Sequence, residues 1–288
     1  MKPSATRIWA MVLRYSALHR RSLLRTFDVF FWPVLDLLVW GFVTSYLQRQ
    51  LPGLASGASG LASGAGGPPY GGGPVGAGVS FLIGGMILWD LHYRAQQGMT
   101  ISLMEEIWTR NIVNLLVTPL RRWEWLVATI LYGLAKVVVI ALVLGGLAFG
   151  LYAFRLWAVG WGLAPLLVHL LIFAWAVGLV TAGFVIRFGY AAEALIWGIP
   201  FLIQPFSAVF YPVAVLPAAL RPIALALPTT YVFEDLRAAL AGDLTVGWAH
   251  ALPLVALNGA YVALGIVVFS ICFRQAARSG RLGRLGQD

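Results

Sequence analysis

The sequence predicts an all-α membrane protein with six transmembrane helices, on the evidence of its composition, its hydropathy and the spacing of its apolar segments. Apolar residues make up 60% of the 288 residues and charged residues only 11%, whereas soluble domains are about 45–50% apolar and about 25% charged. The mean hydropathy is +0.83. With so few charged residues, a single folded core would leave a large apolar surface exposed. Much of the chain must therefore be surrounded by lipid.

Six apolar segments are long enough to cross a bilayer, whose core of about 30 Å needs about 20 helical residues. They are residues 27–47, 79–99, 124–152, 163–186, 191–211 and 251–273. An even number of crossings places both termini on the same side, and Lys and Arg concentrate on the cytoplasmic side of membrane proteins. Fifteen basic residues fall on the side of the termini and four, Arg49, Arg155, Arg221 and Arg237, on the other, so both termini are predicted to be cytoplasmic.

The N-terminal residues 1–26 are predicted to lie along the cytoplasmic membrane surface, with an amphipathic helix over 4–25. The basic residues that recur at spacings of seven and four are Arg7, Arg14, Arg21 and Arg25. The opposite side of this helix is apolar and carries Ile8, Met11, Val12, Tyr15 and Leu18. Such a helix serves either as a lipid anchor or as a contact with a partner protein, and both interpretations stay open.

The remaining chain divides into a transmembrane domain over 27–273 and a basic cytoplasmic tail over 274–288. Within the domain, the outer segment 48–78 contains eleven glycines with Ser, Ala and Pro. This composition is typical of a flexible linker, and its role stays open. The single cysteine, Cys272, lies in an apolar run and is expected to be an inert packing residue.

The cytoplasmic segment between the second and third spans, residues 100–122, is patterned as a short interfacial helix. Its apolar residues recur every three or four positions and comprise Ile101, Met104, Ile107, Trp108, Ile112, Leu115 and Leu116. Glu105, Glu106 and Arg110 take the polar side. We therefore expect one helix over 101–118, stopped by Pro119.

The outer segment 212–240, before the last span, is apolar but rich in proline. The prolines in and just before it are Pro205, Pro212, Pro217, Pro222 and Pro228. Each proline removes a backbone donor and clashes with the preceding turn, so one regular helix is excluded. Short re-entrant helices that dip into the outer leaflet satisfy both facts, provided that protein or water covers the interrupted backbone. These helices either close the outer end of a pathway or form a passive cap.

Two ionisable side chains fall inside predicted spans, Asp36 in the first and Lys136 in the third. Charges at such depths face a bundle interior, a cavity or each other. The two residues either pair with each other or find separate partners. Asp28 and Asp90 are placed nearer the cytoplasmic interface, where a solvated carboxylate costs little, and are assigned no chemistry. His169 is expected to be a hydrogen-bonded packing residue, because no second metal-binding side chain stands at helical spacing.

Two stretches resemble the signatures of the ABC-2 family of ATP-driven transporter permeases. The first, from Met104 to Glu124, combines an acidic and basic helix, an apolar pair, Thr118-Pro119-Leu120 and a Trp-Glu pair where the next span begins. The second, from Tyr211 to Arg237, contains Tyr-Pro, Leu-Pro, a short helix and a Pro-x-x-Tyr-x-x-Glu segment. The Gly-rich loop is not part of the common pattern, but the resemblance covers nearly the whole chain.

The resemblance implies a permease subunit of an exporter in a bacterial cytoplasmic membrane. Two permease copies, or this chain and a homologue, would join two ATPase subunits, and ATP and Mg²⁺ would bind in the ATPase rather than in this chain. The residues implied to couple the ATPase to the spans are Glu105, Glu106, Ile107, Arg110, Leu115, Arg14 and Arg21. The residues implied to form an outer gate are Tyr211, Pro212, Pro217, Pro228, Tyr231, Phe233 and Glu234.

Other functional classes fit the sequence less well. It contains no G-x-x-x-x-G-K-[ST] motif, so no P-loop ATPase site is expected, and no catalytic, cofactor or metal site is predicted. An intramembrane metalloprotease would use Glu105, Glu106 and Arg110, but none of the four histidines has the spacing that it needs. A secondary transporter or channel stays open, although no inverted repeat is visible. The net charge of +9 is not clustered on a polar domain, so nucleic acid is not an expected partner. The transported substrate is not readable.

Overall fold

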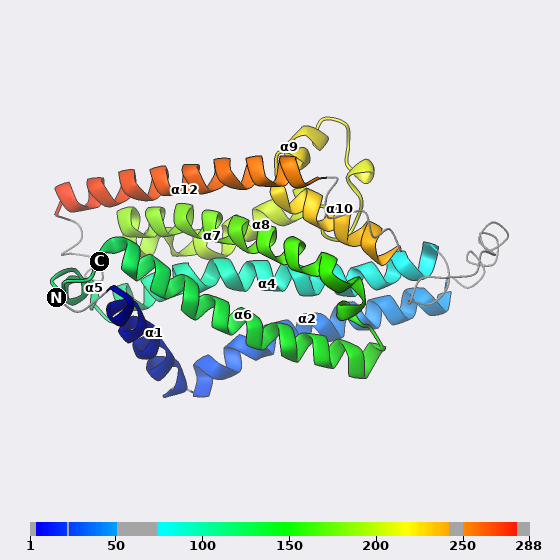
Figure 1. Ribbon diagram of the computed structural model, residues 1–288, viewed down its shortest axis with the longest axis horizontal. Helices are drawn as coiled ribbons and strands as arrows, with labels where there is room; N and C mark the ends of the chain where they lie inside the picture. Colours follow the sequence, from blue (N-terminus) through cyan, green and yellow to red (C-terminus); the bar gives the residue numbers. More distant parts are fainter. Residues whose placement is uncertain (1–3, 22, 51–73, 242–249, 281–288) are drawn as a thin grey trace.

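A computed structural model describes residues 4–21, 23–50, 74–241 and 250–280. These residues form helices joined by short turns, and no β-strand occurs among them, which confirms the all-α fold class. Five long helices run along the long axis of the molecule (Figure 1). They are α2 (Leu23–Gln50), α4 (Pro74–Trp108), α6 (Arg122–Tyr152), α7 (Leu163–Phe188) and α12 (Ala251–Arg278).

Four stretches in the described part of the chain are long and apolar enough to cross a membrane. They are Val29–Leu47, Arg122–Tyr152, Gly160–Phe206 and Ala251–Arg278. The chain is therefore a multi-pass membrane protein. The second predicted span, 79–99, lies in α4 but is not one of these stretches, because polar side chains such as Asp90, Arg94 and Gln97 lower its hydropathy.

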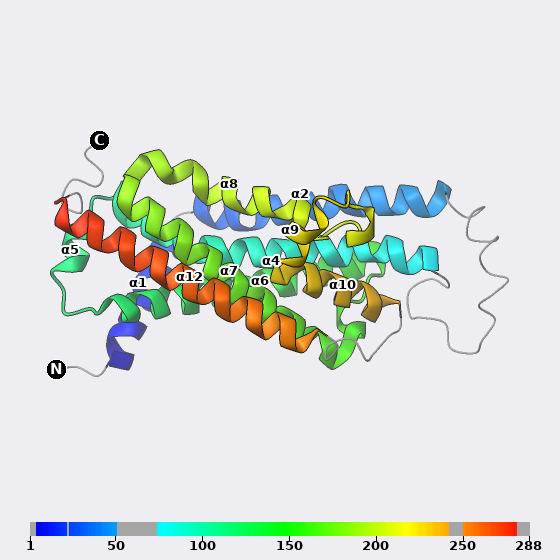
Figure 2. The same cartoon turned by 90° about the horizontal axis from the view of Figure 1, so that it is seen from above.

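The fifth predicted span, 191–211, is shorter in the structure. Its helix α8 (Glu193–Ile203) has 11 residues and is followed by the 3-10 turn η4 (Gln204–Phe206). At 1.5 Å per residue, α8 is about 16 Å long, roughly half of the bilayer core. The chain reverses between α7 and α8 at η3 (Gly189–Ala192), where Gly189 has φ of +63°, so the two helices lie side by side (Figure 2). Pro205 follows α8 and prevents its regular continuation.

The N-terminal helix is also shorter than predicted. α1 (Ser4–Arg20) ends before Arg21, and Arg25 already belongs to α2. One side of α1 packs against α6 and buries Met11 and Tyr15. The apolar side of this helix therefore faces protein, at least in part, rather than lipid alone.

The predicted helix over 101–118 is divided in two. α4 continues from the membrane to Trp108, and the separate helix α5 (Ile112–Leu116) has only five residues. Arg110 has φ of +54° at the break. The Asn111 amide donates to the Glu106 carbonyl at 2.8 Å and closes the end of α4. Because α4 is continuous as far as Trp108, its C-terminal end is joined to the bundle without a break.

Two predicted segments fall partly outside the described residues. Residues 51–73 of the Gly-rich segment 48–78 and residues 281–288 of the basic tail are not described. The last helix reaches Arg278, five residues beyond the predicted end of the sixth span at 273.

The described ends of the chain, in α1 and at the end of α12, lie at the same end of the bundle as α5 (Figure 1). With the predicted cytoplasmic termini, we expect single cysteines at Asn114 and Ser279 to react with an impermeant thiol reagent only after the membrane is opened. A cysteine at Ala218 should react in intact cells. All three positions are exposed, and the native Cys272 is buried, which keeps the background low. If Ser279→Cys is labelled in intact cells and Ala218→Cys is not, the chain has the opposite topology to the predicted one.

Candidate functional site

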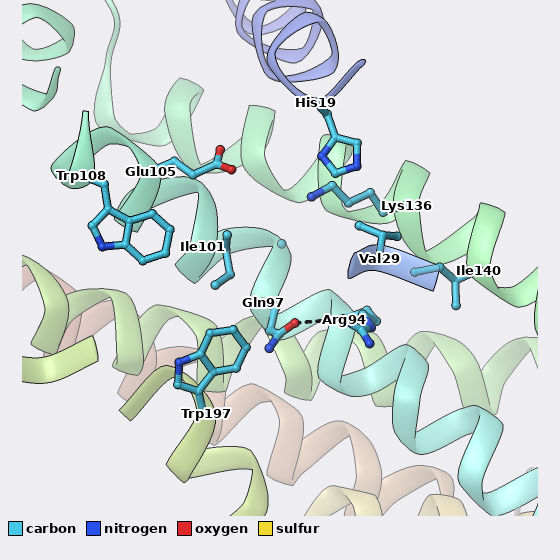
Figure 3. A pocket seen from close by; sticks show the side chains of 11 residues that line it. His19, Val29, Arg94, Gln97, Ile101, Glu105, Trp108, Lys136, Ile140 and Trp197 are labelled. Atoms are coloured by element: carbon cyan, nitrogen blue, oxygen red, sulfur yellow. Dashed lines mark hydrogen bonds between the residues drawn. The ribbon is translucent and has the colours of Figure 1, made fainter. Parts of the chain in front are cut away.

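Two adjoining cavities form a groove on the side of α4 where α2 and α8 lie (Figure 2). The larger has a volume of about 630 Å³ and the smaller about 320 Å³. Arg94, Gln97 and Trp197 line both cavities. The smaller cavity extends toward the end of α1, where His19 and Lys136 lie on the side of Arg94 opposite Trp197 (Figure 3). The groove therefore runs from the level of α1 into the middle of the bundle.

The larger cavity combines aromatic walls with a polar centre. Its aromatic lining comprises Trp32, Trp40, Trp89, Tyr93, Trp197, Phe201 and Phe210. The rings of Trp40 and Phe210 stack with centroids 4.2 Å apart, which joins α2 to the segment after α8. Its polar lining comprises Asp36, Asp90, Arg94, Gln97 and Gln204. A volume of this size and a mostly apolar lining with few polar groups are typical of small-molecule sites.

Asp90 is a buried member of this polar centre, which corrects the expectation of a solvated carboxylate. Its side chain is only 5% exposed, and its Oδ1 lies 3.5 Å from Nε of Arg94, one helical turn further along α4. Arg94 also donates from a terminal nitrogen to Oε1 of Gln97 at 3.4 Å (Figure 3). Sequence analysis missed this trio, although the Asp90 and Arg94 spacing of four residues is a pattern that pairs charges on one helix face.

Asp36 and Lys136 line different cavities. Asp36 faces the larger cavity together with Asp90 and Arg94. Lys136 lines the smaller one, with Nζ 4.5 Å from the ring centroid of Tyr132. Asp36 of α2 thus shares a cavity with Asp90 and Arg94 of α4. The pairing of Asp36 with Lys136 stays a prediction. His169 lies elsewhere, with Nδ1 3.0 Å from the amide nitrogen of Asn258, and joins α7 to α12 as a hydrogen-bonded packing residue.

A second cluster of polar side chains ties α1 to the C-terminal end of α4. Arg14 donates to both carboxylate oxygens of Glu106, at 2.5 and 2.9 Å, and Asn111 donates to the same carboxylate at 2.6 Å. Glu106 is only 1% exposed. The sequence placed Glu106 on an open polar face, but the structure buries it beneath α1. The hydrogen bonds with Glu106 raise the pKa of Arg14 above its ordinary value, so the Arg14 guanidinium stays charged at physiological pH.

A parallel pair ties α1 to the start of α6. Arg7 donates to both oxygens of Glu124, at 2.9 and 2.5 Å. Glu124 also accepts the backbone amide of Arg121 at 2.9 Å, which satisfies a free donor at the start of the helix. Between the two pairs, the Trp125 indole donates to the Tyr15 hydroxyl at 2.9 Å, and burial raises the pKa of Tyr15, so its hydroxyl stays protonated. Arg7 and Glu124 were not among the predicted site residues.

The other predicted coupling residues divide into buried and accessible ones. Ile107 is buried and Leu115 half-buried in the apolar cluster that also holds Tyr15. Glu105 is half-buried and lines the smaller cavity (Figure 3). Arg21 and Arg110 are exposed. Large apolar side chains exposed near Arg110 are Trp108, Val117 and Trp123.

The outer segment contains the interrupted helices that its prolines predict. They are η5 (Val213–Val215), α9 (Arg221–Leu225) and α10 (Pro228–Leu240). Side chains satisfy the backbone carbonyls that the breaks leave free. Thr230 donates to the carbonyls of Ala224 and Phe206, and Arg221 donates to those of Leu216 and Ala214. This network explains how an interrupted backbone persists in an apolar segment.

The predicted gate residues mostly bond within the outer segment itself. The Tyr231 hydroxyl donates to the Leu225 carbonyl at 2.9 Å, and the Tyr211 hydroxyl donates to the Pro205 carbonyl. The Glu234 carboxylate accepts a hydrogen bond from the Val213 backbone amide at 2.8 Å and another from the Arg237 guanidinium at 2.6 Å. Pro212 and Pro217 are exposed, whereas Pro228 is buried at the start of α10.

Phe233, one of the predicted gate residues, packs inside this chain. Its side chain is fully buried in the core of this chain, with its ring centroid 6.4 Å from that of Trp89. Residues two positions apart on a helix of about 3.6 residues per turn lie on nearly opposite faces, so Tyr231 stays half-exposed while Phe233 packs inward. Phe233 therefore supports the inner wall of the groove from behind.

Comparison with known proteins places this architecture in one family. No curated protein matches the chain. The family model described as ABC-2 type transporter matches residues 8–241, which include most of α1, the lining of both cavities, the Arg14 and Glu106 pair and the outer segment. Since the match covers far more than half of the 288 residues, the chain belongs to the ABC-2 type transporter family.

Proposed function

We propose that the chain is the permease subunit of an ATP-driven exporter, in which two permease copies enclose the substrate pathway and separate ATPase subunits supply the energy. Membership of the ABC-2 type transporter family supports a role as the membrane component of an ABC transporter. The observation that carries the proposal further is the groove between α2, α4 and α8, with charged side chains at membrane depth.

Those charges argue for a covered or water-filled groove. Asp36, Asp90 and Arg94 line a cavity in the middle of the bundle, where contact with lipid tails would be costly. A second copy related by a two-fold axis would cover the groove and present the same groove in return. Aromatic side chains exposed at its rim, such as Trp32, Trp197 and Phe201, supply apolar contact area for that copy or for a bound substrate.

The ATPase is expected to dock at the cytoplasmic end. The sequence contains no P-loop motif of its own. Exposed Arg110, Val117 and Trp123 around α5 offer a mixed charged and apolar surface outside the membrane. Glu106 and Ile107 lie directly beneath this surface and are buried, so their role is to connect it to α1 and to the bundle. Closure of the ATPase would then move α4 as a unit and change the groove.

Co-purification tests the docking surface. The full-length chain, captured in mild detergent from membranes of its source cells, should bring down a polypeptide that carries a P-loop motif and hydrolyses ATP. Arg110→Glu combined with Val117→Asp should reduce this activity about tenfold, because a buried aspartate and a reversed charge disrupt the contact. Arg278→Glu, an exposed charge reversal at the end of α12, is the matched control and should leave it unchanged.

Two results would contradict the proposal. One is capture of a well-folded chain without any ATPase activity. The other is equal ATPase recovery with the double variant and with Arg278→Glu, which would place the docking surface elsewhere.

A further inference from the structure

The larger cavity has an excess of negative charge in a chain that is strongly positive overall. Two carboxylates, Asp36 and Asp90, line it against one guanidinium, Arg94, although the whole chain carries a net charge of +9. In the adjoining cavity, Glu105 and Lys136 balance each other. The lining of the larger cavity therefore carries one negative charge more than its one guanidinium neutralises.

Arg94 neutralises this charge incompletely. The Nε to Oδ1 separation of 3.5 Å between Arg94 and Asp90 is longer than a good charge-assisted hydrogen bond. The second oxygen of Asp90, Oδ2, is buried and has no hydrogen-bond partner among the described residues. The Nε2 amide of Gln97, a side chain 7% exposed, likewise lacks a partner among them. Buried polar atoms without partners are costly, so they indicate that a further group completes the site.

The walls of the cavity suit a cation that carries apolar groups. Aromatic rings attract cations through their negative faces, most strongly for Trp. Four tryptophans line the cavity, and they are Trp32, Trp40, Trp89 and Trp197. Trp32 lies on α2 and Trp197 on α8, the two helices that form the groove together with α4, and both side chains are exposed.

We propose that this cavity binds amphipathic cations, molecules that join a positively charged nitrogen or phosphonium centre to apolar groups, and that these are the exporter's substrates. The proposal rests on the proposed function for the assignment of substrate. The cationic centre would lie against Asp36 and Asp90, and the apolar groups against the tryptophans. A protonated amine would also donate to Oδ2 of Asp90, and an acceptor on the same molecule would take the Gln97 amide.

Two probes of equal shape and opposite charge test whether the cavity prefers cations. Purified full-length chain in phosphatidylcholine nanodiscs should bind tetraphenylphosphonium at least about tenfold more tightly than tetraphenylborate, measured by equilibrium dialysis against empty nanodiscs. Equal binding of the two ions, or tighter binding of the borate, would overturn the proposal.

Substitutions in the cavity should shift this preference in opposite directions. Asp36→Asn and Asp90→Asn should each weaken tetraphenylphosphonium binding about tenfold with little change for tetraphenylborate, whereas Arg94→Gln should strengthen it. Glu193→Gln, at the start of α8 and outside the cavity lining, is the matched control and should bind like the unaltered chain. Size-exclusion profiles identify any variant that fails to fold. The remaining variants still show whether the cavity prefers a cation or an anion. An equal loss in Glu193→Gln and Asp36→Asn would show that the cation responds to overall charge rather than to the cavity.

Failure of this inference is distinguishable from failure of the proposed function. If an ATPase co-purifies but the cation does not bind preferentially, only the substrate class is wrong. If the cation binds and no ATPase is captured, the site stands and the assignment of the chain to an ATP-driven exporter fails.

Discussion

Replacement of Gly98 by alanine is expected to destabilise the chain more than any other change of similar size proposed for it. A Cβ atom at Gly98, on α4, would lie 2.8 Å from Cα of Gly133 on α6. The atom that blocks it belongs to the backbone, so no side chain can rotate away and the two helices must separate. Small residues that allow two backbones to approach are a main source of helix association in membranes, where no hydrophobic driving force acts between helices.

The expected loss is about 1–3 kcal/mol in the free energy of unfolding, the range found for overpacking of tight contacts. Gly98 also lines the smaller cavity, so the separation should open the groove as well. Thermal unfolding of the purified chain, followed by tryptophan fluorescence, measures the change.

Gly146→Ala supplies a matched control on α6 itself. An added Cβ at Gly146 would meet no atom within 4 Å. Alanine is favoured over glycine inside a helix by about 0.5–1 kcal/mol, so this variant should be as stable as the unaltered chain or more so. A Gly98→Ala variant that unfolds at the same temperature as Gly146→Ala would show that α4 and α6 are not packed backbone to backbone.

Hydropathy and proline positions predicted most of the helices, because both act locally along the chain. The apolar runs in α2, α6, α7 and α12 are each long and apolar enough to cross a membrane. The prolines from Pro212 to Pro228 placed the breaks of the outer segment. The fifth span was overestimated because hydropathy registers apolar character without showing that Pro205 ends the helix.

Partners between distant segments were not predictable in the same way. Periodicity placed Arg14 on a polar face of α1 and Glu106 on a polar face of α4, yet it could not show that these faces meet. Each looked like an open surface, which agreed with the ATPase contact that the family resemblance implies for both. The same reasoning assigned Phe233 to a gate, because a buried and an exposed aromatic residue look alike in one sequence.

The polar centre of the groove shows a different limit. Charge counting used Arg94 as a topology signal for the cytoplasm and Asp90 as a solvated carboxylate, and so considered the two residues separately. Their spacing of four residues on one helix, with Gln97 a further three along, was the available signal. The role of Asp36 needed the packing of α2 on α4, which no local pattern contains.

Charge reversal at Arg14 is expected to separate the cytoplasmic end of α4 from α1 and to uncouple ATP hydrolysis from transport. Arg14→Glu would set two carboxylates against each other at a site where Glu106 is only 1% exposed. Breaking a buried ion pair costs several kcal/mol. Because the Arg14 side chain is 34% exposed, water screens part of this cost, and we expect about 1.5–3 kcal/mol.

The exchange Arg14→Glu with Glu106→Arg separates the electrostatic link from the identity of each residue. The reversed pair can re-form across the same contact between α1 and α4, so it should recover a substantial part of the stability, although Asn111 loses its acceptor. Arg20→Glu, an exposed reversal at the end of α1, should change stability by less than about 0.5 kcal/mol.

The decisive measurement is ATPase activity with and without transport substrate in the reconstituted complex, and it rests on the proposed function. If α1 and α4 move together, Arg14→Glu should retain basal hydrolysis and lose its stimulation by substrate, and the exchanged pair should regain it. This follows because Arg14 joins α1 to α4, which extends from the groove to the predicted cytoplasmic surface, whereas Arg20 lies on α1 beyond that contact. The contrary result would be equal stimulation of ATP hydrolysis by substrate in Arg14→Glu and Arg20→Glu, with the expected loss of stability in Arg14→Glu alone. The ion pair would then stabilise the fold without coupling hydrolysis to transport.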